Sequence, residues 1–397
     1  MGRIFDMIKL LGKFQLKKNK MRVNYNIPIV VIAHNRPKSL DRLLKSLQEA
    51  EYSRETRLII SIDGGENVET IRLAKDFSWR FGIKEIIIHE KNLGIREHVL
   101  SCGDIALKYD GIVLLEDDLF VSPVFYHFVT KAIGFYEADE NIGGFSLYSH
   151  QYNETAQLPF KPVSDASDVF FFQYASSWGQ FYTKRHWNEF KEWYMLNENT
   201  TFVEEDGIPP NILNWPDSSW KKYFIEYIIE KDKYFVFPRV SLTTNFGDPG
   251  FHMDFKEKYL QVPLQYEKRK FNFKNFNDSN CIYDVFCEIL PKCLKKLAPH
   301  LAGYDFGVDL FGIKKLSTIH HPLLLTTKKF SSSIISFAKE MKPLEANVIE
   351  NLHGNEIGLT RMEDCEDPPY ASKLYAYHDE GELLYHYNLR FLHLTDR

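Results

Sequence analysis

One apolar run that ends in three acidic residues constrains the fold of this chain most. Residues 111–115 read Gly-Ile-Val-Leu-Leu, with the length and branched side chains of a buried parallel strand. Glu116, Asp117 and Asp118 follow directly, and residues 119–121 are apolar again. Acidic triplets on solvated turns are a common alternative, but such turns are seldom enclosed by two apolar segments. Because adjacent carboxylates repel one another, the triplet predicts a site for a cation or a polyhydroxyl ligand.

The composition is that of an ordinary globular protein with an excess of aromatic residues. The 397 residues suffice for two or three domains, and 44% hydrophobic with 15% aromatic residues can fill sizeable cores. A net charge of -5 and the lack of zinc-finger, RRM-like or Walker A patterns argue against nucleic acid as a partner. The five cysteines are odd in number and lack CxxC spacing, which predicts free thiols in a reducing compartment.

Residues 1–22 form a basic amphipathic segment. They contain seven lysines or arginines against the single acid Asp6, with apolar residues near helical spacing. The segment is too polar to span a bilayer and has no small-residue cleavage site. It predicts a cytoplasmic protein held peripherally at the inner face of the membrane by anionic lipids. The alternatives are a helix packed on the body of the protein and a disordered tail.

From residue 27 the pattern alternates between strands and helices. Strands are predicted at 27–33, 57–62, 85–89 and 111–115, and helices at 39–47, 70–81 and 95–109. Repeated β-α-β units make a doubly wound, mostly parallel sheet that binds ligands at the carboxyl ends of its strands. Residues 34–36, Asp63 and the acidic triplet follow such ends, and we expect them to converge on one cleft.

The residues at this cleft indicate the chemistry of its ligand. No GxGxxG follows the first strand, so phosphates would need a metal or basic side chains for binding. A divalent ion on carboxylates can bridge two phosphates and neutralise a departing diphosphate. The pattern therefore predicts transfer from a nucleotide diphosphate donor.

Five segments in order resemble the GT-A glycosyltransferases. They are residues 28–37, 59–65, 115–119, 176–180 and 237–247. The set is similar to the N-acetylglucosaminyltransferase I group, including the protein O-mannose enzymes, and to bacterial sugar transferases that assemble surface polysaccharides. The resemblance covers about residues 27–262. It implies an α/β, Rossmann-like GT-A domain at 23–262, after the segment 1–22, and leaves 263–397 as a mixed, mainly helical accessory region.

The resemblance also implies an activity. It is an inverting, Mn²⁺- or Mg²⁺-dependent transfer of a sugar, with N-acetylglucosamine favoured, from a UDP-sugar to a glycan acceptor. The basic segment favours a lipid-linked acceptor in the synthesis of bacterial surface polysaccharide or lipopolysaccharide. Two alternatives stay open: a nucleotidyltransferase, which would want a glycine-rich basic signature after the first strand, and a noncatalytic sugar-binding protein on a GT-A fold.

The resemblance assigns roles to the residues of the cleft. Asp118 would bind the metal ion, while Asp117 and Glu116 would hold the ribose and the sugar side of the donor. Asp63 and Arg36 would contact the uracil base. Arg36 has the alternative of a helix-start residue that pairs with a nearby acid, and Asp63, before two glycines, that of an Asx turn.

The resemblance also implies a catalytic base. An inverting displacement needs a group that takes the proton of the acceptor hydroxyl. Asp217, shortly before Trp220, matches the base of the family, and a helix N-cap is its structural alternative. The reserves are Glu204, Glu205 and Asp206.

Two further segments are predicted to contact the donor. The indole of Trp178 would stack on a sugar, and Gly179 would let the backbone approach it, although a core tryptophan is an equally ordinary role. Residues 247–252 resemble a loop that closes over a bound donor, with Gly247 among the residues that would bind it. His252 would complete the metal shell or contact a phosphate, or else be a hydrogen-bonded loop residue.

Overall fold

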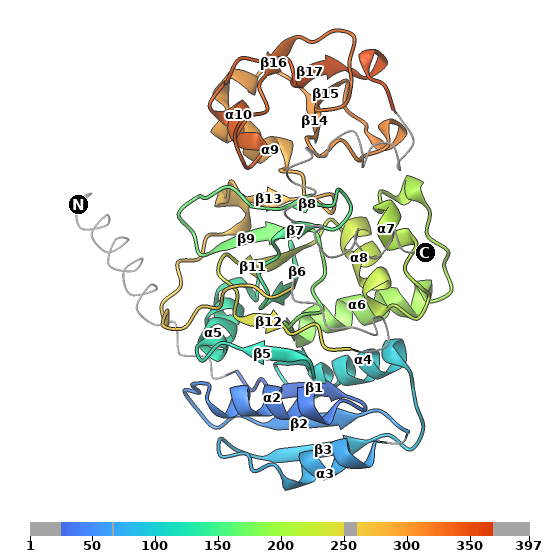
Figure 1. Cartoon of the computed structure of the whole chain (residues 1–397), viewed down its shortest axis with the longest axis vertical. Helices are drawn as coiled ribbons and strands as arrows, with labels where there is room; N and C mark the ends of the chain where they lie inside the picture. Colours follow the sequence, from blue (N-terminus) through green and yellow to red (C-terminus); the bar gives the residue numbers. More distant parts are fainter. Residues whose placement is uncertain (1–24, 66, 250–259, 368–397) are drawn as a thin grey trace, which may run out of the picture.

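The computed structural model describes residues 25–65, 67–249 and 260–367. In Figure 1 the strands of one large sheet succeed one another along the long axis, from β3 near the bottom to β13, with helices packed beside them. A smaller sheet lies beyond β13 at the top of the view. The predicted basic segment 1–22 lies outside the described residues.

The large sheet confirms the α/β class. Its nine strands within the described residues follow the order β13-β9-β11-β6-β10-β4-β1-β2-β3. Five of the eight neighbouring pairs are parallel and three are antiparallel. The strands are β1 (Ile29–Ala33), β2 (Leu58–Ile62), β3 (Lys84–Ile88), β4 (Gly111–Glu116), β6 (Ile142–Ser146), β9 (Val169–Phe172), β10 (Gln180–Thr183), β11 (Tyr234–Pro238) and β13 (Ile282–Tyr283).

The strand order creates a topological switch point at the acidic triplet. The chain runs outward from β1 through β2 to β3 and then returns to place β4 on the other side of β1. Both neighbours of β1 are parallel to it, and Ile32 pairs with Glu116 at the end of β4. Ligands of open α/β sheets bind at such a point, outside the carboxyl ends of the strands.

Helices cover the large sheet. Helix α2 shows why: it begins with Pro37, which suits the first turn, and buries Leu40, Leu43, Leu44 and Leu47, the period of one apolar helical face. Helices α4, α6 and α8 pack against one another on the sheet. The helices are α2 (Pro37–Gln48), α3 (Val68–Asp76), α4 (Ile95–Gly103), α5 (Phe125–Tyr136), α6 (Lys184–Asn197), α7 (Pro210–Leu213) and α8 (Trp220–Glu230).

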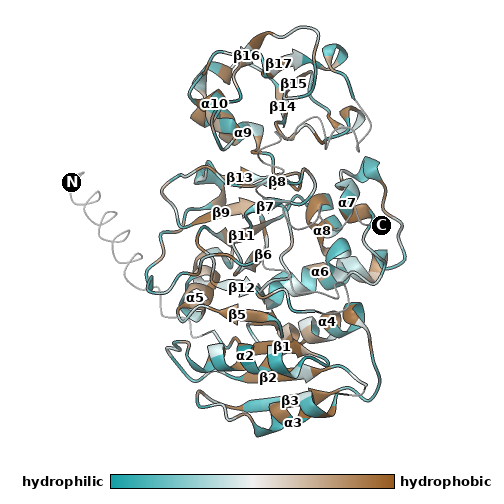
Figure 2. Cartoon of the chain, in the orientation of Figure 1, coloured by the Kyte–Doolittle hydropathy of each residue, from teal (hydrophilic) through white to brown (hydrophobic). Residues whose placement is uncertain are grey.

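Two small sheets complete the body. Strand β5 (Leu119–Val121) pairs with β12 (Thr243–Asn245), so that Asn245 lies opposite Leu119, next to the triplet. Strands β7 (Tyr152–Asn153) and β8 (Leu158–Pro159) form a short hairpin. Strand β9 and helix α5 are coloured mainly as hydrophobic in Figure 2, and every residue of β9 is buried.

The C-terminal region needs a correction. It is mixed, as expected, but the described part is built around a four-stranded sheet rather than around helices, because its apolar segments are short and alternate with turns. The fully buried ion pair between Lys328 Nζ and Asp309 Oδ2, 3.2 Å apart, lies at this sheet. Its elements are α9 (Pro291–Leu297), β14 (Phe306–Asp309), β15 (Leu323–Thr326), β16 (Ile335–Phe337), α10 (Glu345–Ile349) and β17 (Ile357–Arg361).

Within the described ranges, no helix combines the length and the apolar character needed to cross a membrane.

The contact between α4 and α6 has no spare room. Gly103 ends α4, and a Cβ atom on it would lie 1.9 Å from Cζ2 of the fully buried Trp187. The indole is also held by its hydrogen bond to Asp104 Oδ1 at 2.9 Å, so the ring cannot move away without losing this bond.

We expect Gly103→Ala to reduce the free energy of unfolding by about 1–3 kcal/mol, the usual cost of overpacking, although alanine is the better helix former. Thermal unfolding measures this change. Gly303→Ala is the control, because its Cβ would meet no atom within 4 Å. An unchanged melting temperature for Gly103→Ala would contradict the close packing of α4 on α6.

Candidate active site

The acidic triplet lies in the turn between β4 and β5. Glu116 is the last residue of β4 and is partly buried, whereas Asp117 and Asp118 are buried, at 2% and 8% exposure. The strand run that precedes them is fully buried, so the backbone leaves no freedom to spread the three carboxylates into solvent. Their mutual repulsion must be offset within the protein.

Arg36 provides part of that offset. It follows β1, directly before α2, and its guanidinium donates to Oδ1 of Asp117 and, at 3.0 Å, to Oδ2 of Asp118. The ion-pair alternative for Arg36 is therefore the arrangement that the structure contains. Charge-assisted bonds of this kind are about twice as strong as neutral ones.

One guanidinium does not neutralise three carboxylates. Burial raises the pKa of Glu116 to about 8, and the charge of Asp118 acts in the same direction. Burial also raises the pKa of Asp117 to about 6, although Arg36 opposes this. The pKa of Arg36 is raised despite its own burial, because Asp117 and Asp118 attract its charge. The triplet thus favours binding of a proton or of a further cation.

The loop after β12 closes one side of the triplet. Asn245 Nδ2 lies 3.4 Å from Asp118 Oδ1, and the backbone N–H of Phe246 donates to the carbonyl of Asp118 at 3.1 Å. Gly247, predicted as a donor contact, has a φ of 56° and donates its N–H to Asn245 Oδ1. Asp248 pairs with Arg42 of α2. The described part of this loop is therefore tied to the triplet and to α2.

Asp63 has a structural role that uses its whole carboxylate. Its Oδ1 accepts from the N–H groups of Gly64 and Leu93, both at 2.8 Å, and its Oδ2 from that of Gly94 at 3.1 Å. The bond to Gly64 is that of the predicted Asx-type turn. Asp63 therefore joins the end of β2 to the turn before α4, at the same sheet end as the triplet.

Trp178 and Gly179 lie at the start of β10, beside β4. The indole of Trp178 is partly exposed and packs edge-on against Tyr148, with ring centres 4.8 Å apart. Gly179 has a φ of 91°, and a Cβ on it would lie 2.7 Å from the side chain of Thr243. Strand β12 thus explains the glycine, whereas Trp178 keeps a partly exposed indole next to Lys221 and His150.

Asp217 lies in the exposed segment before α8. Its side chain is 93% exposed and 4.0 Å from Lys222 Nζ, and Arg96 donates to its backbone carbonyl at 3.0 Å. Ser219, not Asp217, is the N-cap residue of α8. The reserve acids are engaged: Glu204 and Glu205 pair with Lys315, and Asp206 accepts from the backbone N–H of Val203.

The side chains at the triplet provide only some of the ligand atoms that a divalent metal ion needs. Carboxylate oxygens are suitable ligands for Mn²⁺ or Mg²⁺, and the sole bond to Asp118 Oδ1 within the described residues is the long one from Asn245. In those residues, however, no three His, Cys, Asp or Glu side chains are grouped to hold a metal. His252, the further predicted ligand, lies outside the described residues. Other ligands would have to come from a bound donor and water.

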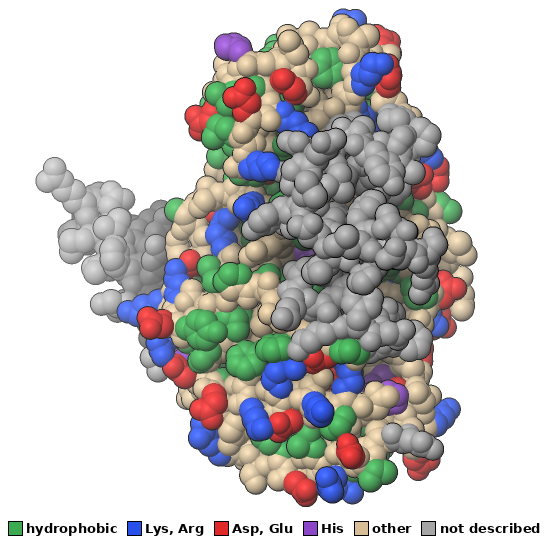
Figure 3. Space-filling model, viewed as in Figure 1, with side chains coloured by type: hydrophobic (Ala, Val, Ile, Leu, Met, Phe, Trp, Pro, Cys, Tyr) green, Lys and Arg blue, Asp and Glu red, His purple; other side chains and the backbone are tan. Residues whose placement is uncertain are grey.

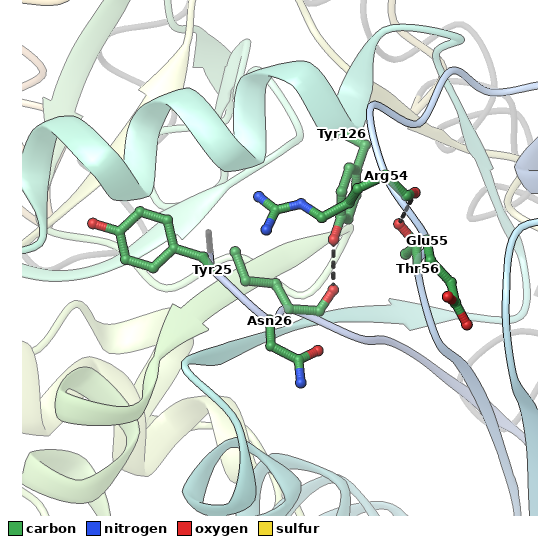
Figure 4. Close-up of a pocket in the computed structure, with 7 residues that line it drawn as sticks. Tyr25, Asn26, Arg54, Glu55, Thr56 and Tyr126 are labelled. Atoms are coloured by element: carbon green, nitrogen blue, oxygen red, sulfur yellow. Dashed lines mark hydrogen bonds between the residues drawn. The ribbon is translucent and has the colours of Figure 1, made fainter. Parts of the chain in front are cut away.

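Two surface hollows lie at the other end of the sheet. One of about 180 Å³ (Figure 4) is lined by Tyr25, Asn26, Ile27, Arg54, Glu55, Thr56 and Tyr126. The second, of about 720 Å³, adjoins it and shares Arg54 and Glu55. Both lie where β1 and β2 begin, whereas the predicted site residues lie where these strands end.

The surface charges are mixed in the view of Figure 3. Over the lower part of this face, basic and acidic side chains are interspersed, so that part carries no broad field of one sign.

Sequence reasoning missed several residues around the triplet. No role was assigned to Lys221 of α8. Arg42 and Asn245, which contact the carbonyl and the carboxylate of Asp118, were not assigned a role either. The run Asn-Phe-Gly-Asp-Pro at 245–249 was a usable turn signal for Asn245. Lys221 gave none, because a lysine in a first helical turn is usually solvated.

Comparisons with known proteins give distant likenesses. No protein-family model matches this chain. The structure of S. aureus TarS 1–349 is similar to this chain with a TM-score of 0.33 and 12% identity, over 55% of this chain and 60% of that one. A longer TarS structure gives the same TM-score and identity, over 55% of this chain and 36% of its own length. The mannosyltransferase PcManGT from Pyrobaculum calidifontis, in complex with GDP-Man and Mn²⁺, gives a TM-score of 0.29 and 11% identity over 46% and 53%. This chain thus spans less than two thirds of each, and a likeness of this degree assigns no activity.

The raised pKa of Glu116 gives stability a defined pH dependence. Such a carboxyl group stabilises the fold below its unfolded pKa of 4.5, and this contribution is lost as the pH rises through about 8. Glu116→Gln removes the ionisation and keeps the shape. We expect its melting temperature, relative to that of the native protein, to increase by a few degrees between about pH 5 and about pH 8.5.

The control is Asp217→Asn, which changes an exposed side chain outside the triplet and should keep the pH dependence that Glu116 gives the native protein. A Glu116→Gln difference that does not vary between about pH 5 and about pH 8.5 would show that the Glu116 carboxyl group is ionised throughout this range.

Proposed function

We propose that the protein is an inverting, nucleotide-sugar-dependent glycosyltransferase. The observation that carries the proposal is the position of the triplet: three crowded carboxylates, with one guanidinium against them, lie at the switch point where an open α/β sheet binds its ligand. The motif resemblance to GT-A enzymes gives this site its reaction class. A UDP-sugar is the proposed donor, with N-acetylglucosamine as the favoured sugar.

The proposed donor spans β2, β1 and β4. Its base would lie near Asp63 and Arg36, and its ribose and sugar near Asp117 and Glu116. The ion pairs of Arg36 with Asp117 and Asp118 support this arrangement, because they hold a base-contacting residue next to the triplet. Asp118 would hold Mn²⁺ or Mg²⁺ together with the donor, and the ion, when bound, would neutralise charge on the departing diphosphate.

Asp217 is the proposed general base. Its carboxylate takes no part in the cap of α8, and the reserve acids are engaged elsewhere. Trp215, two residues earlier, packs its ring 4.4 Å from Lys221 Nζ, and Lys221 in turn interacts electrostatically with Glu116. The Trp215 contact and this longer-range interaction support our assignment of the segment around Asp217 to the side of the triplet. An aspartate carboxylate there would accept the proton of an acceptor hydroxyl.

We expect UDP-N-acetylglucosamine with Mn²⁺ to raise the melting temperature, because a ligand of the native state stabilises it. Asp118→Asn should abolish this shift and lower UDP release about 10²-fold or more, since a charge that stabilises the leaving group is lost. Asp41→Asn, an exposed acid of α2, is the control and should behave as the native protein.

Asp217→Asn should keep the donor-induced shift and lose transfer, by about 10²–10⁴-fold. Donor binding without turnover in the native protein would instead support a noncatalytic sugar-binding protein. If neither UDP- nor GDP-sugars shift the melting temperature, the proposed function is wrong.

We also propose a lipid-linked acceptor at the inner face of a membrane, on the basis of residues 1–22 alone. Deletion of residues 2–22 should reduce binding to vesicles of phosphatidylglycerol and phosphatidylcholine in a sedimentation assay, because basic side chains near an anionic surface each contribute about 1 kcal/mol. Vesicles of phosphatidylcholine alone are the control. Equal sedimentation of the full and shortened chains would exclude this role.

A further inference from the structure

Three aromatic side chains surround Lys221, a residue to which the proposed function gives no role of its own. One of them, Trp178, was predicted from the sequence to stack on the donor sugar. Lys221, in the first turn of α8, is partly buried. Its Nζ lies 4.4 Å from the ring centre of Trp215, 5.0 Å from that of Tyr174 and 5.8 Å from that of Trp178. Three aromatic faces therefore surround one ammonium, and cation–π attraction holds it in place.

The ammonium of Lys221 is not neutralised by a direct partner. Within the described residues no carboxylate lies within 4.0 Å of its Nζ, and its hydrogen bond to the Tyr174 hydroxyl is long, at 3.4 Å. Burial lowers the pKa of Lys221, although the more distant charges of Glu154 and Glu116 oppose this. Since an ammonium has three N–H donors, it can still bind a ligand here.

Packing and hydrogen-bonding contacts hold Trp178 and Tyr174 in position. His150 stacks on Trp178 with ring centres 6.2 Å apart and packs 5.1 Å from Tyr174. Burial lowers the pKa of His150 to about 4, so this histidine is neutral at pH 7 and does not compete with Lys221 for an anion. The Tyr174 hydroxyl also lies 3.3 Å from Glu154 Oε2. A preformed site of this kind loses little entropy on binding.

The order of the strands separates Lys221 and its aromatic neighbours from the residues proposed to bind the nucleotide. Arg36 and Asp63 follow β1 and β2, on one side of β4, whereas Trp178 precedes β10 on the other side. Tyr174 follows β9, further along the same side. Trp178 and Trp215 are both partly exposed, so part of each indole can be reached by a ligand beside Lys221. Because the proposed donor lies over β2, β1 and β4, the β10 side of the triplet is left for the acceptor.

We propose that Lys221, Tyr174, Trp178 and Trp215 form an acceptor subsite for a sugar ring that carries a carboxylate. The inference rests on the proposed glycosyltransferase function. The exposed parts of the two indoles pack against the C–H surface of the sugar ring, and the lysine ammonium pairs with its carboxylate. A neutral sugar would leave the desolvated ammonium without a partner, so the subsite selects against it.

The test compares methyl β-D-glucuronide with methyl β-D-glucoside, by saturation-transfer NMR on the full chain. We expect the glucuronide to bind with a dissociation constant at least about tenfold lower, as for a charge-assisted bond. Lys221→Met should remove this preference and leave weak binding of both. Lys231→Met, at the exposed end of the same helix, should keep it.

Equal affinity for the two glycosides, no binding of either, or a preference that survives in Lys221→Met would each overturn the proposal. So would loss of the UDP-N-acetylglucosamine shift in Lys221→Met, because the lysine would then serve the donor. The donor shift in the native protein is measured in parallel. If it is absent while the glucuronide preference holds, the proposed function fails, and the group around Lys221 is a binding site for a carboxylate sugar but not an acceptor subsite. The converse result overturns only the subsite.

Discussion

The geometry of the site depends on the ion pairs between Arg36 and the two aspartates of the triplet. Buried like charges at the end of β4 would drive the turn apart, and loss of the guanidinium would leave them uncompensated. Arg36 also marks the start of α2, whose Ser39 and Arg42 hold Asp248. One electrostatic constraint therefore links two strands, a helix and the loop after β12.

The two sides of β4 differ in the groups that they present. On the β1 and β2 side the polar groups are engaged with backbone N–H groups and with one another, as Asp63 illustrates. On the β10 side, partly exposed indoles surround a lysine that has no close carboxylate within the described residues. The proposed donor and acceptor would use this difference, one on each side of β4.

Sequence alone predicted the features that depend on local pattern. The strands β1 to β4, the face of α2 and the switch-point position of the triplet follow from apolar periodicity and chain order. The pairing of Arg36 and the turn at Asp63 were foreseen only as alternatives, because the choice depends on which partner the fold brings near. Lys221 and Tyr174 are 47 residues apart, and no local signal predicts that they meet. The C-terminal sheet was missed because short apolar runs suit helix and strand equally.

Strand β13 carries a consequence for how the chain can be divided. It lies beyond residue 262, and it covers β9, whose Val-Phe-Phe-Phe run is buried throughout. Tyr283 of β13 is anchored in turn by its bond to Glu345 Oε1 at 3.0 Å. A chain cut at residue 262 would leave β9 as a bare apolar border, open to pairing with other molecules. The C-terminal region therefore covers an apolar edge of the large sheet that would otherwise favour aggregation.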